Sequence, residues 1–161
     1  MKKVYYSASI TGAKGVSEDF QMYIIRYIQS LGYKVLSEHV GIHDTQKLFA
    51  KMSENAGINI PKRDGYEKDI RDTDIKWVEE ADYFVGLVDG PSLGVGIEIE
   101  HALLRSKIGL PPCRILCLVH ADNFAKLSAM VKGITADNFN LEKYTSENNA
   151  KEIIKLFLKA G

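Results

Sequence analysis

Apolar residues near the start of the chain form first a continuous run and then a helical pattern. The run from Lys3 to Ile10 is rich in β-branched and aromatic residues and meets a glycine-containing stretch, which predicts a strand followed by a loop. Ser17 suits a helix N-cap, and apolar residues then recur three or four apart over 20–31. Residues 33–36 are predicted to form a second short strand.

The rest of the chain repeats this alternation. Further helices are predicted at 67–81, 96–107, 125–132 and 147–160, and further strands at 83–88, 114–119 and 139–141. The strand at 83–88 is apolar almost throughout, as expected where helices cover both faces of a sheet. The pattern predicts the α/β class, with a parallel five-stranded sheet and helices on both faces. A chain of 161 residues is long enough for one such domain.

Residues 41–66 fit the alternation less well. Leu48, Met52 and Ala56 have helical spacing, but glycines and Pro61 interrupt the segment. Its composition is consistent with a mobile insertion over a site and equally with a plain surface excursion.

Composition limits the partners and the compartment. The chain has 21 basic and 21 acidic residues, so no charge footprint points to polymeric nucleic acid or to a membrane surface. No apolar segment has the length of a membrane span, and the start lacks the pattern of a signal peptide. Cys113 and Cys117 lie too far apart on one strand for a disulfide and lack CxxC spacing. We expect core thiols and a cytoplasmic protein, or a nuclear one in a eukaryote.

Asp74 lies on the side of the helix at 67–81 that should be buried. At about 100° per residue it shares one stripe with Trp77 and Val78. A buried aspartate is unfavourable unless it is paired or hydrogen-bonded. Both a salt-bridged core acid and a carboxyl of shifted pKa in a cleft would explain this position.

The stretch PSLGVGIEIEHA, residues 91–102, follows the strand at 83–88. It therefore lies at the carboxyl edge of the sheet, where open α/β folds bind ligands. Glycines, helix-start N–H groups and the Ser92 hydroxyl suit an anion, although a tight strand-to-helix turn has the same pattern. Glu98 and Glu100 project about 200° apart, so only one can face the cleft.

The loop from Ser7 to Gly12 follows the first strand at the same edge. Two serine-bearing loops and two carboxylates would then meet in one crevice. This arrangement suits an anionic ligand and cleavage of a glycosidic bond, in which one carboxylate attacks and the other group transfers protons. His39 and His43 are four apart, but no helix and no third ligand are predicted there, so we expect no metal site.

Several segments in order resemble the 2'-deoxynucleoside 5'-phosphate N-hydrolases of the nucleoside 2-deoxyribosyltransferase superfamily. They are VYYSASITG at 4–12, SEHV at 37–40, DIKWVEEAD at 74–82, PSLGVGIEIEHA at 91–102, RILCL at 114–118 and LSAMVKG at 127–133. The resemblance implies a single deoxyribosyltransferase-like domain over 1–161 with a flavodoxin-like (Rossmann-like) sheet. It also implies hydrolysis of the N-glycosidic bond of deoxynucleoside monophosphates without a metal or organic cofactor.

The resemblance further implies roles for individual residues. Glu98 would attack C1' of the sugar, Asp74 would assist proton transfer, and Tyr5 would support the nucleophile and the preference for a 2'-deoxy sugar. Ser92 and Ser128 would bind the phosphate, with Ser128 donated by the neighbouring subunit of a homodimer. The remaining predicted substrate-binding residues are Ala8, Ser9, Ile10, Gly12, His39, Gly94 and Met130.

The chain departs from the family pattern in its first loop. Thr11 stands where the family commonly has arginine, and Ala8 where it has glycine, so a bidentate phosphate clamp is missing and Lys14 is the nearest cation. Three alternatives stay open: a transferase that passes deoxyribose to a second base, a ribonucleotide N-hydrolase similar to the cytokinin-type phosphoribohydrolases, and a non-catalytic nucleotide-binding module.

Overall fold

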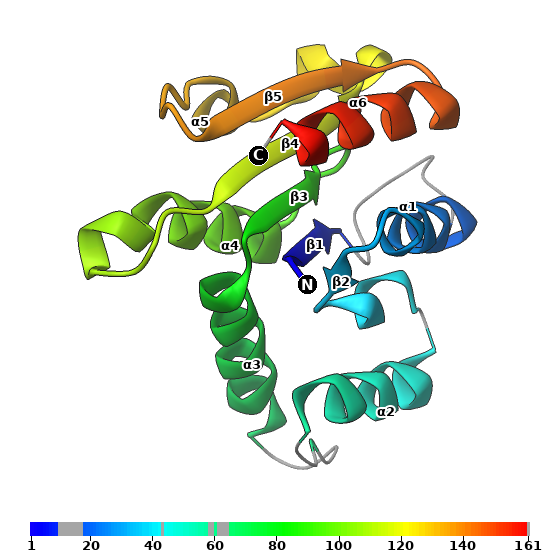
Figure 1. Cartoon of the computed structure of the whole chain (residues 1–161), viewed down its shortest axis with the longest axis vertical. Helices are drawn as coiled ribbons and strands as arrows, with labels where there is room; N and C mark the ends of the chain where they lie inside the picture. The colour runs from blue at the N-terminus through cyan, green and yellow to red at the C-terminus, as the bar shows by residue number, and fades with distance from the viewer. Residues whose placement is uncertain (10–17, 43, 58–59, 61–64, 161) are drawn as a thin grey trace.

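The computed structural model describes residues 1–9, 18–42, 44–57, 60 and 65–160 (Figure 1). The strands are β1 (Lys3–Ala8), β2 (Lys34–Val35), β3 (Tyr83–Leu87), β4 (Arg114–His120) and β5 (Phe139–Tyr144). The α-helices are α1 (Glu18–Ser30), α2 (Thr45–Ala56), α3 (Tyr66–Glu80), α4 (Leu93–Leu104), α5 (Ala129–Lys132) and α6 (Glu147–Lys159). Three 3-10 helices accompany them, η1 (Glu38–Gly41), η2 (Arg105–Ile108) and η3 (Ala121–Lys126).

The strands form one parallel sheet in the order β2-β1-β3-β4-β5. This confirms the predicted α/β class and the flavodoxin-like strand order. The chain first moves from β1 to β2 on one side and then returns to place β3 on the other side. The switch point therefore lies between β1 and β3, where Tyr5 pairs with Phe84 and Ser7 with Gly86. In folds of this kind, ligands bind at the carboxyl ends of the strands beside such a point.

Helices cover both faces of the sheet, with α1 and α6 on one side and α3 and α4 on the other (Figure 1). Successive side chains of a strand point to opposite faces. Val4 and Tyr6 of β1 therefore pack in the core beneath α1 and α6, whereas Tyr5 packs in the core beneath α3 and α4. Tyr5 and the residues that alternate with it on β1 therefore face the α3–α4 side of the sheet.

The start of α4 differs from the predicted start at residue 96. The Ser92 hydroxyl accepts a hydrogen bond from the N–H of Val95 at 3.4 Å, so Ser92 is the N-cap and the helix begins at Leu93. Gly94 and Gly96 consequently lie in the first turns of the helix and not in a loop before it. Capping by serine outweighs the low helix propensity of glycine here. The anion-binding feature is therefore a helix N-terminus rather than a glycine-rich loop.

One further segment differs from the prediction, and another agrees with it. Residues 125–132 were expected to form one helix, but the chain forms η3 and α5, because the Ser128 hydroxyl accepts from the N–H of Met130 and caps a new helix. Within residues 41–66, α2 contains the three residues of helical spacing, and its Met52 is fully buried. The proposed mobility of that segment stays a prediction.

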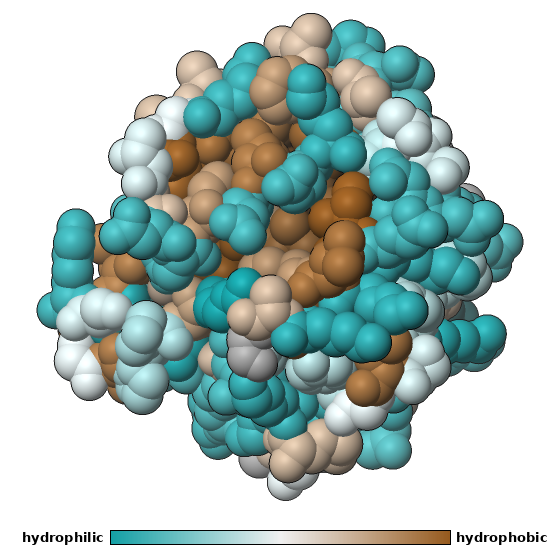
Figure 2. Space-filling model, turned by 45° about the horizontal axis from the view of Figure 1, so that its top comes forward, coloured by the Kyte–Doolittle hydropathy of each residue, from teal (hydrophilic) through white to brown (hydrophobic). Residues whose placement is uncertain are grey.

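Figure 2 shows one face of the molecule covered mostly by hydrophilic residues, with hydrophobic residues gathered in a central hollow. Within the part of the chain that the structure describes, no helix is both long and apolar enough to span a membrane. Cys113 and Cys117 are free and buried, which confirms them as core thiols.

Candidate active site

Four elements bring five polar side chains together on the α3–α4 side of the sheet. We call these residues the carboxylate cluster: Tyr5 and Ser7 of β1, His39 of η1, Asp74 of α3 and Glu98 of α4. Their positions follow from the alternation along β1 and from the helix faces that pack onto the sheet. The predicted catalytic residues Glu98, Asp74 and Tyr5 therefore do meet, and their roles stay predictions.

Glu98 receives two hydrogen bonds from β1. The Ser7 hydroxyl donates to Glu98 Oε2 at 2.5 Å, and the Tyr5 hydroxyl forms a second hydrogen bond with the carboxylate. Burial raises the pKa of Glu98, while both hydrogen bonds oppose that rise by stabilising the ionised form. Glu100 is exposed, as expected for the glutamate that faces away from the cleft.

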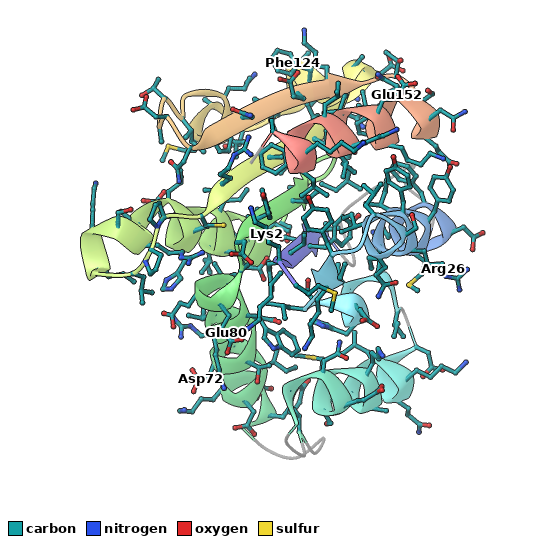
Figure 3. All side chains as sticks on the ribbon, in the orientation of Figure 1. Lys2, Arg26, Asp72, Glu80, Phe124 and Glu152 are labelled. Carbon is teal, nitrogen blue, oxygen red and sulfur yellow. The ribbon has the colours of Figure 1, made fainter. Side chains whose placement is uncertain are left out.

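Asp74 is the more strongly perturbed of the two acids. Its side chain is 16% exposed. Burial, followed by the charge of Glu98, raises the pKa of Asp74 to about 8, and the hydrogen bond from Tyr5 opposes the rise. Asp72 behaves differently, because it points outward from α3 and forms an ion pair with Lys68 (Figure 3). The helical stripe thus correctly separated the largely buried Asp74 from its exposed neighbour Asp72.

Tyr5 joins the two acids. Its side chain is fully buried, and burial together with the charges of Glu98 and Asp74 keeps its pKa well above the ordinary value. The phenol therefore stays protonated and acts as a donor to the carboxylates. Because a hydroxyl has one proton, it can donate to only one of them at a time. The protonation states of Asp74 and Glu98 are consequently coupled through Tyr5.

His39 closes the cluster beside Asp74. Its Nε2 lies 3.5 Å from Asp74 Oδ1, and its ring centroid lies 5.4 Å from that of Trp77. Burial lowers the pKa of His39 to about 4, so the ring is neutral at physiological pH. Among the described residues, His39 Nδ1 and Asp74 Oδ1 have no hydrogen-bond partner. Both atoms are buried, where polar groups ordinarily have a hydrogen-bond partner.

A cavity of about 280 Å³ between α3 and α4 opens onto both acids. Ile70, Ile75 and Ile97 provide apolar walls, and Gly94 leaves space beside the start of α4. The volume is near the lower limit of small-molecule sites and suits a flat base with part of a sugar. This cavity therefore combines an apolar surface with two carboxyl groups of raised pKa, as enzyme sites commonly do.

A second cavity of about 610 Å³ lies on the other side of α4, between its start and the η3–α5 segment. Ser92 and Ser128 of the same chain both line it, together with Val95 and Ile99. The structure thus places the two predicted phosphate-binding serines near each other but apart from the cavity of Glu98. Met130 is 84% exposed on α5 and lines neither cavity.

The remaining predicted residues lie at the end of β1 or beyond it. Ala8 and Ser9 are buried, and the Ser9 carbonyl accepts from Gln21 Nε2 at 3.3 Å. The predicted residues Ile10 and Gly12 lie outside the described residues. Thr11, Lys14 and His43 also lie outside them.

Ser7 is a site residue that the sequence pattern did not single out. A usable signal was present, because Ser7 is two residues after Tyr5 on a strand and must share its face. No group of three or more His, Cys, Asp or Glu in the described ranges could hold a metal ion.

No protein-family model matches the chain. A protein of Trichoplax adhaerens assigned to the 2'-deoxynucleoside 5'-phosphate N-hydrolases is 31% identical over 158 residues, 97% of this chain and 93% of the relative. The 5-hydroxymethyl-dUMP N-hydrolase of Danio rerio is 31% identical over 159 residues, 97% of this chain and 95% of the relative. The human protein of that name is 32% identical over 153 residues, 94% of this chain and 75% of the relative.

A solved structure shares the fold. It is a CMP N-glycosidase of Clostridium botulinum, with a TM-score of 0.63, 17% sequence identity, and coverage of 97% of this chain and 99% of that chain.

Proposed function

The chain belongs to the 2'-deoxynucleoside 5'-phosphate N-hydrolase family, and we propose that it hydrolyses the N-glycosidic bond of 2'-deoxynucleoside 5'-monophosphates. The products are the free base and 2-deoxyribose 5-phosphate. The observation that carries this proposal is the pair Asp74 and Glu98, joined by Tyr5 at one cavity. Two carboxyl groups in unequal environments suit cleavage of a glycosidic bond, because one can attack while the other supplies a proton.

In the first step, Glu98 attacks C1' of the sugar as an ionised carboxylate. A C–O bond forms to Glu98, the C1'–N bond breaks, and its electron pair leaves with the base. Asp74, whose pKa is about 8, carries a proton near neutral pH and donates it to the departing base. The hydrogen bonds from Ser7 and Tyr5 favour the ionised form of Glu98 in the free enzyme.

In the second step, water attacks C1' of the glycosyl–enzyme ester. Asp74, now ionised, accepts a proton from that water, the bond to Glu98 breaks, and the carboxylate is regenerated. Both acids thereby return to their starting states. Neutral His39 stays beside Asp74 throughout, because its pKa of about 4 keeps it uncharged.

We place the substrate phosphate at the N-terminus of α4. Free N–H groups at a helix start and the partial positive charge there favour an anion, and Ser92 supplies a hydroxyl. Ser128 would complete this site from the neighbouring subunit of a homodimer. Leu93 and Met130 support such an interface, because they are 90% and 84% exposed and apolar. The free buried thiols suit a reducing compartment such as the cytoplasm.

The nucleophile is tested by Glu98→Ala, with Glu100→Ala as the matched control on the exposed side of the same helix. Free base released from the four deoxynucleoside monophosphates should fall about 10³-fold or more in Glu98→Ala. The variant should still bind nucleotide, and the control should keep activity within about threefold. Base release by Glu98→Ala at the wild-type rate would exclude Glu98 as the nucleophile.

A further inference from the structure

Asp89, two residues after the end of β3, makes three hydrogen bonds outside the carboxylate cluster. Its Oδ1 accepts from the backbone N–H of His120 at 2.7 Å and from Asn123 Nδ2 at 3.0 Å. Its Oδ2 accepts from the Tyr144 hydroxyl at 2.5 Å. These partners come from the end of β4, from η3 and from the end of β5. One carboxylate therefore ties the segment after β3 to three later parts of the chain.

The Asp89 side chain accepts a hydrogen bond from β4 just beyond the last main-chain hydrogen bond between β3 and β4. The N–H of Val88 still donates to the carbonyl of Leu118 at 2.9 Å. The next available N–H of β4, that of His120, donates to the Asp89 side chain instead. The carboxylate thereby satisfies a backbone donor and fixes the chain as it leaves the sheet. Hydrogen bonds to an ionised carboxylate are stronger than those between neutral groups.

This anchor lies between the two segments that carry the phosphate-binding candidates. Only Gly90 and Pro91 separate Asp89 from Ser92, and the proline ring restricts the backbone between them. On the other side, Asn123 belongs to η3, which leads directly to Ser128. Asp89, Asn123 and both serines line the cavity of about 610 Å³. Because only two residues separate Asp89 from Ser92, a displacement of Asp89 should also move the start of α4.

We propose that Asp89 is a positioning residue that holds the N-terminus of α4, and Ser92 with it, against the η3–α5 segment and thereby sets the affinity for the substrate phosphate. The inference rests on the proposed function. Asp89 does not touch the reacting atoms, so its loss should weaken phosphate binding without changing the chemistry at Glu98.

The test compares Asp89→Ala, Asp89→Asn and Asp122→Ala in the full chain. Asparagine can restore all three bonds, because its carbonyl oxygen accepts from His120 and Asn123 and its amide donates to the Tyr144 oxygen. Asp122 is a neighbouring aspartate whose side chain is 89% exposed, so its removal controls for lost charge. The measurements are kcat and KM for deoxynucleoside monophosphates, the Ki of the matching deoxynucleosides, and calorimetric Kd for 2-deoxyribose 5-phosphate.

For Asp89→Ala we expect KM and the sugar-phosphate Kd to rise about tenfold, with kcat and nucleoside Ki within about threefold of wild type. Asp89→Asn and Asp122→Ala should stay near wild type. A purely structural role would instead change nucleotide and nucleoside constants together, or lower stability alone, and either result would overturn the inference.

The same measurements separate this inference from the proposed function. A wild-type protein that binds the sugar phosphate but releases no base would refute the N-hydrolase activity. The Kd values of the three variants for 2-deoxyribose 5-phosphate would still decide the role of Asp89. A wild-type protein that does not bind the sugar phosphate would refute the role of Asp89.

Discussion

At the residue scale, the two neighbouring acids differ in the groups that surround them. Glu98 receives hydrogen bonds from Ser7 and Tyr5, and both favour its ionised form. Asp74 shares the single Tyr5 proton with Glu98 and otherwise faces neutral His39, so burial and the charge of Glu98 dominate its pKa. Two carboxylates this close resist simultaneous ionisation. The extra donor on Glu98 is the basis for the proposal that Glu98 is the anion and Asp74 carries the proton.

Asp74→Asn tests this assignment through the pH dependence of stability. The pKa of Asp74 is raised from 3.8 to about 8 in the folded protein, so folding favours its protonated form. The stability that this proton confers is complete below about pH 4 and is lost as the pH rises through about 8. Asparagine cannot ionise, so the Tm of the variant relative to wild type should rise by about 3 °C or more between pH 5 and pH 9. Base release should meanwhile fall about 10³-fold.

Asp72→Asn is the control for this comparison. Asp72 lies on the same helix, and its hydrogen bond with Lys68 lowers its pKa, so the variant should gain no stability at high pH. An equal Tm difference at pH 5 and pH 9 for Asp74→Asn would show that the proton does not reside on Asp74.

At the element scale, the relative position of α3 and α4 determines how Asp74 and Glu98 meet. Arg105 follows α4 directly, and its Nη1 donates to the carbonyl oxygens of Val78 at 3.2 Å and Ala81 at 2.6 Å at the end of α3. Arg105 is buried, so these bonds are shielded from water. The guanidinium therefore connects the carboxyl end of α4 to the carboxyl end of α3. Its positive charge also offsets the negative end of the α3 dipole.

Arg105→Ala should lower the free energy of unfolding by about 3 kcal/mol, because two buried carbonyls lose a charged donor. Lys107→Ala in the same 3-10 helix is the control, since Lys107 is exposed. Its effect should stay within about 0.5 kcal/mol. Urea unfolding of both variants measures the difference, and equal stabilities would contradict the role given to Arg105.

At the scale of the whole molecule, the strand order places the candidate site at the carboxyl ends of the central strands β1 and β3. β1 and β3 are neighbours at the switch point, so Ser7 and the start of α4 lie on the same side of the molecule. The two serines expected to hold phosphate line a separate cavity within one chain. In the proposed homodimer, Ser128 of a second subunit reaches the phosphate site at the N-terminus of α4.

Complementation between inactive variants tests that proposal. In a heterodimer of Glu98→Ala and Ser128→Ala chains, a donated serine leaves one site intact and one site with both changes. After equal amounts of the two variants are mixed and their subunits exchange, about half of the dimers should be heterodimers. Each has one intact site of two, so the mixture should show about a quarter of wild-type activity. The assay uses substrate concentrations at which each variant alone is nearly inactive. Light scattering should show a dimer. A monomer, or a mixture no more active than the average of its parents, would contradict donation of Ser128.

The sequence by itself determined the five strands, most of the helices, the sheet class and the inward face of α3. Periodicity is a local property, so helical spacing placed Asp74 toward the core without knowledge of what packs there. Residue spacing alone did not show that Asp74 and Glu98 act together. That prediction came from the resemblance to the family. The predicted start of α4 at residue 96 was wrong. The two glycines disfavour a helix before that residue, but the cap at Ser92 stabilises one there.

Only the tertiary structure decided the contacts that give these residues their chemistry. The hydrogen bond from Ser7 to Glu98 joins residues 91 apart in the chain, and that from Tyr144 to Asp89 joins residues 55 apart. Such contacts depend on the register of β1 against β3 and on where each helix packs. The raised pKa of Asp74 likewise arises from burial and from Glu98 on another helix. Local sequence sets the direction in which a side chain points, and long-range packing sets what it meets.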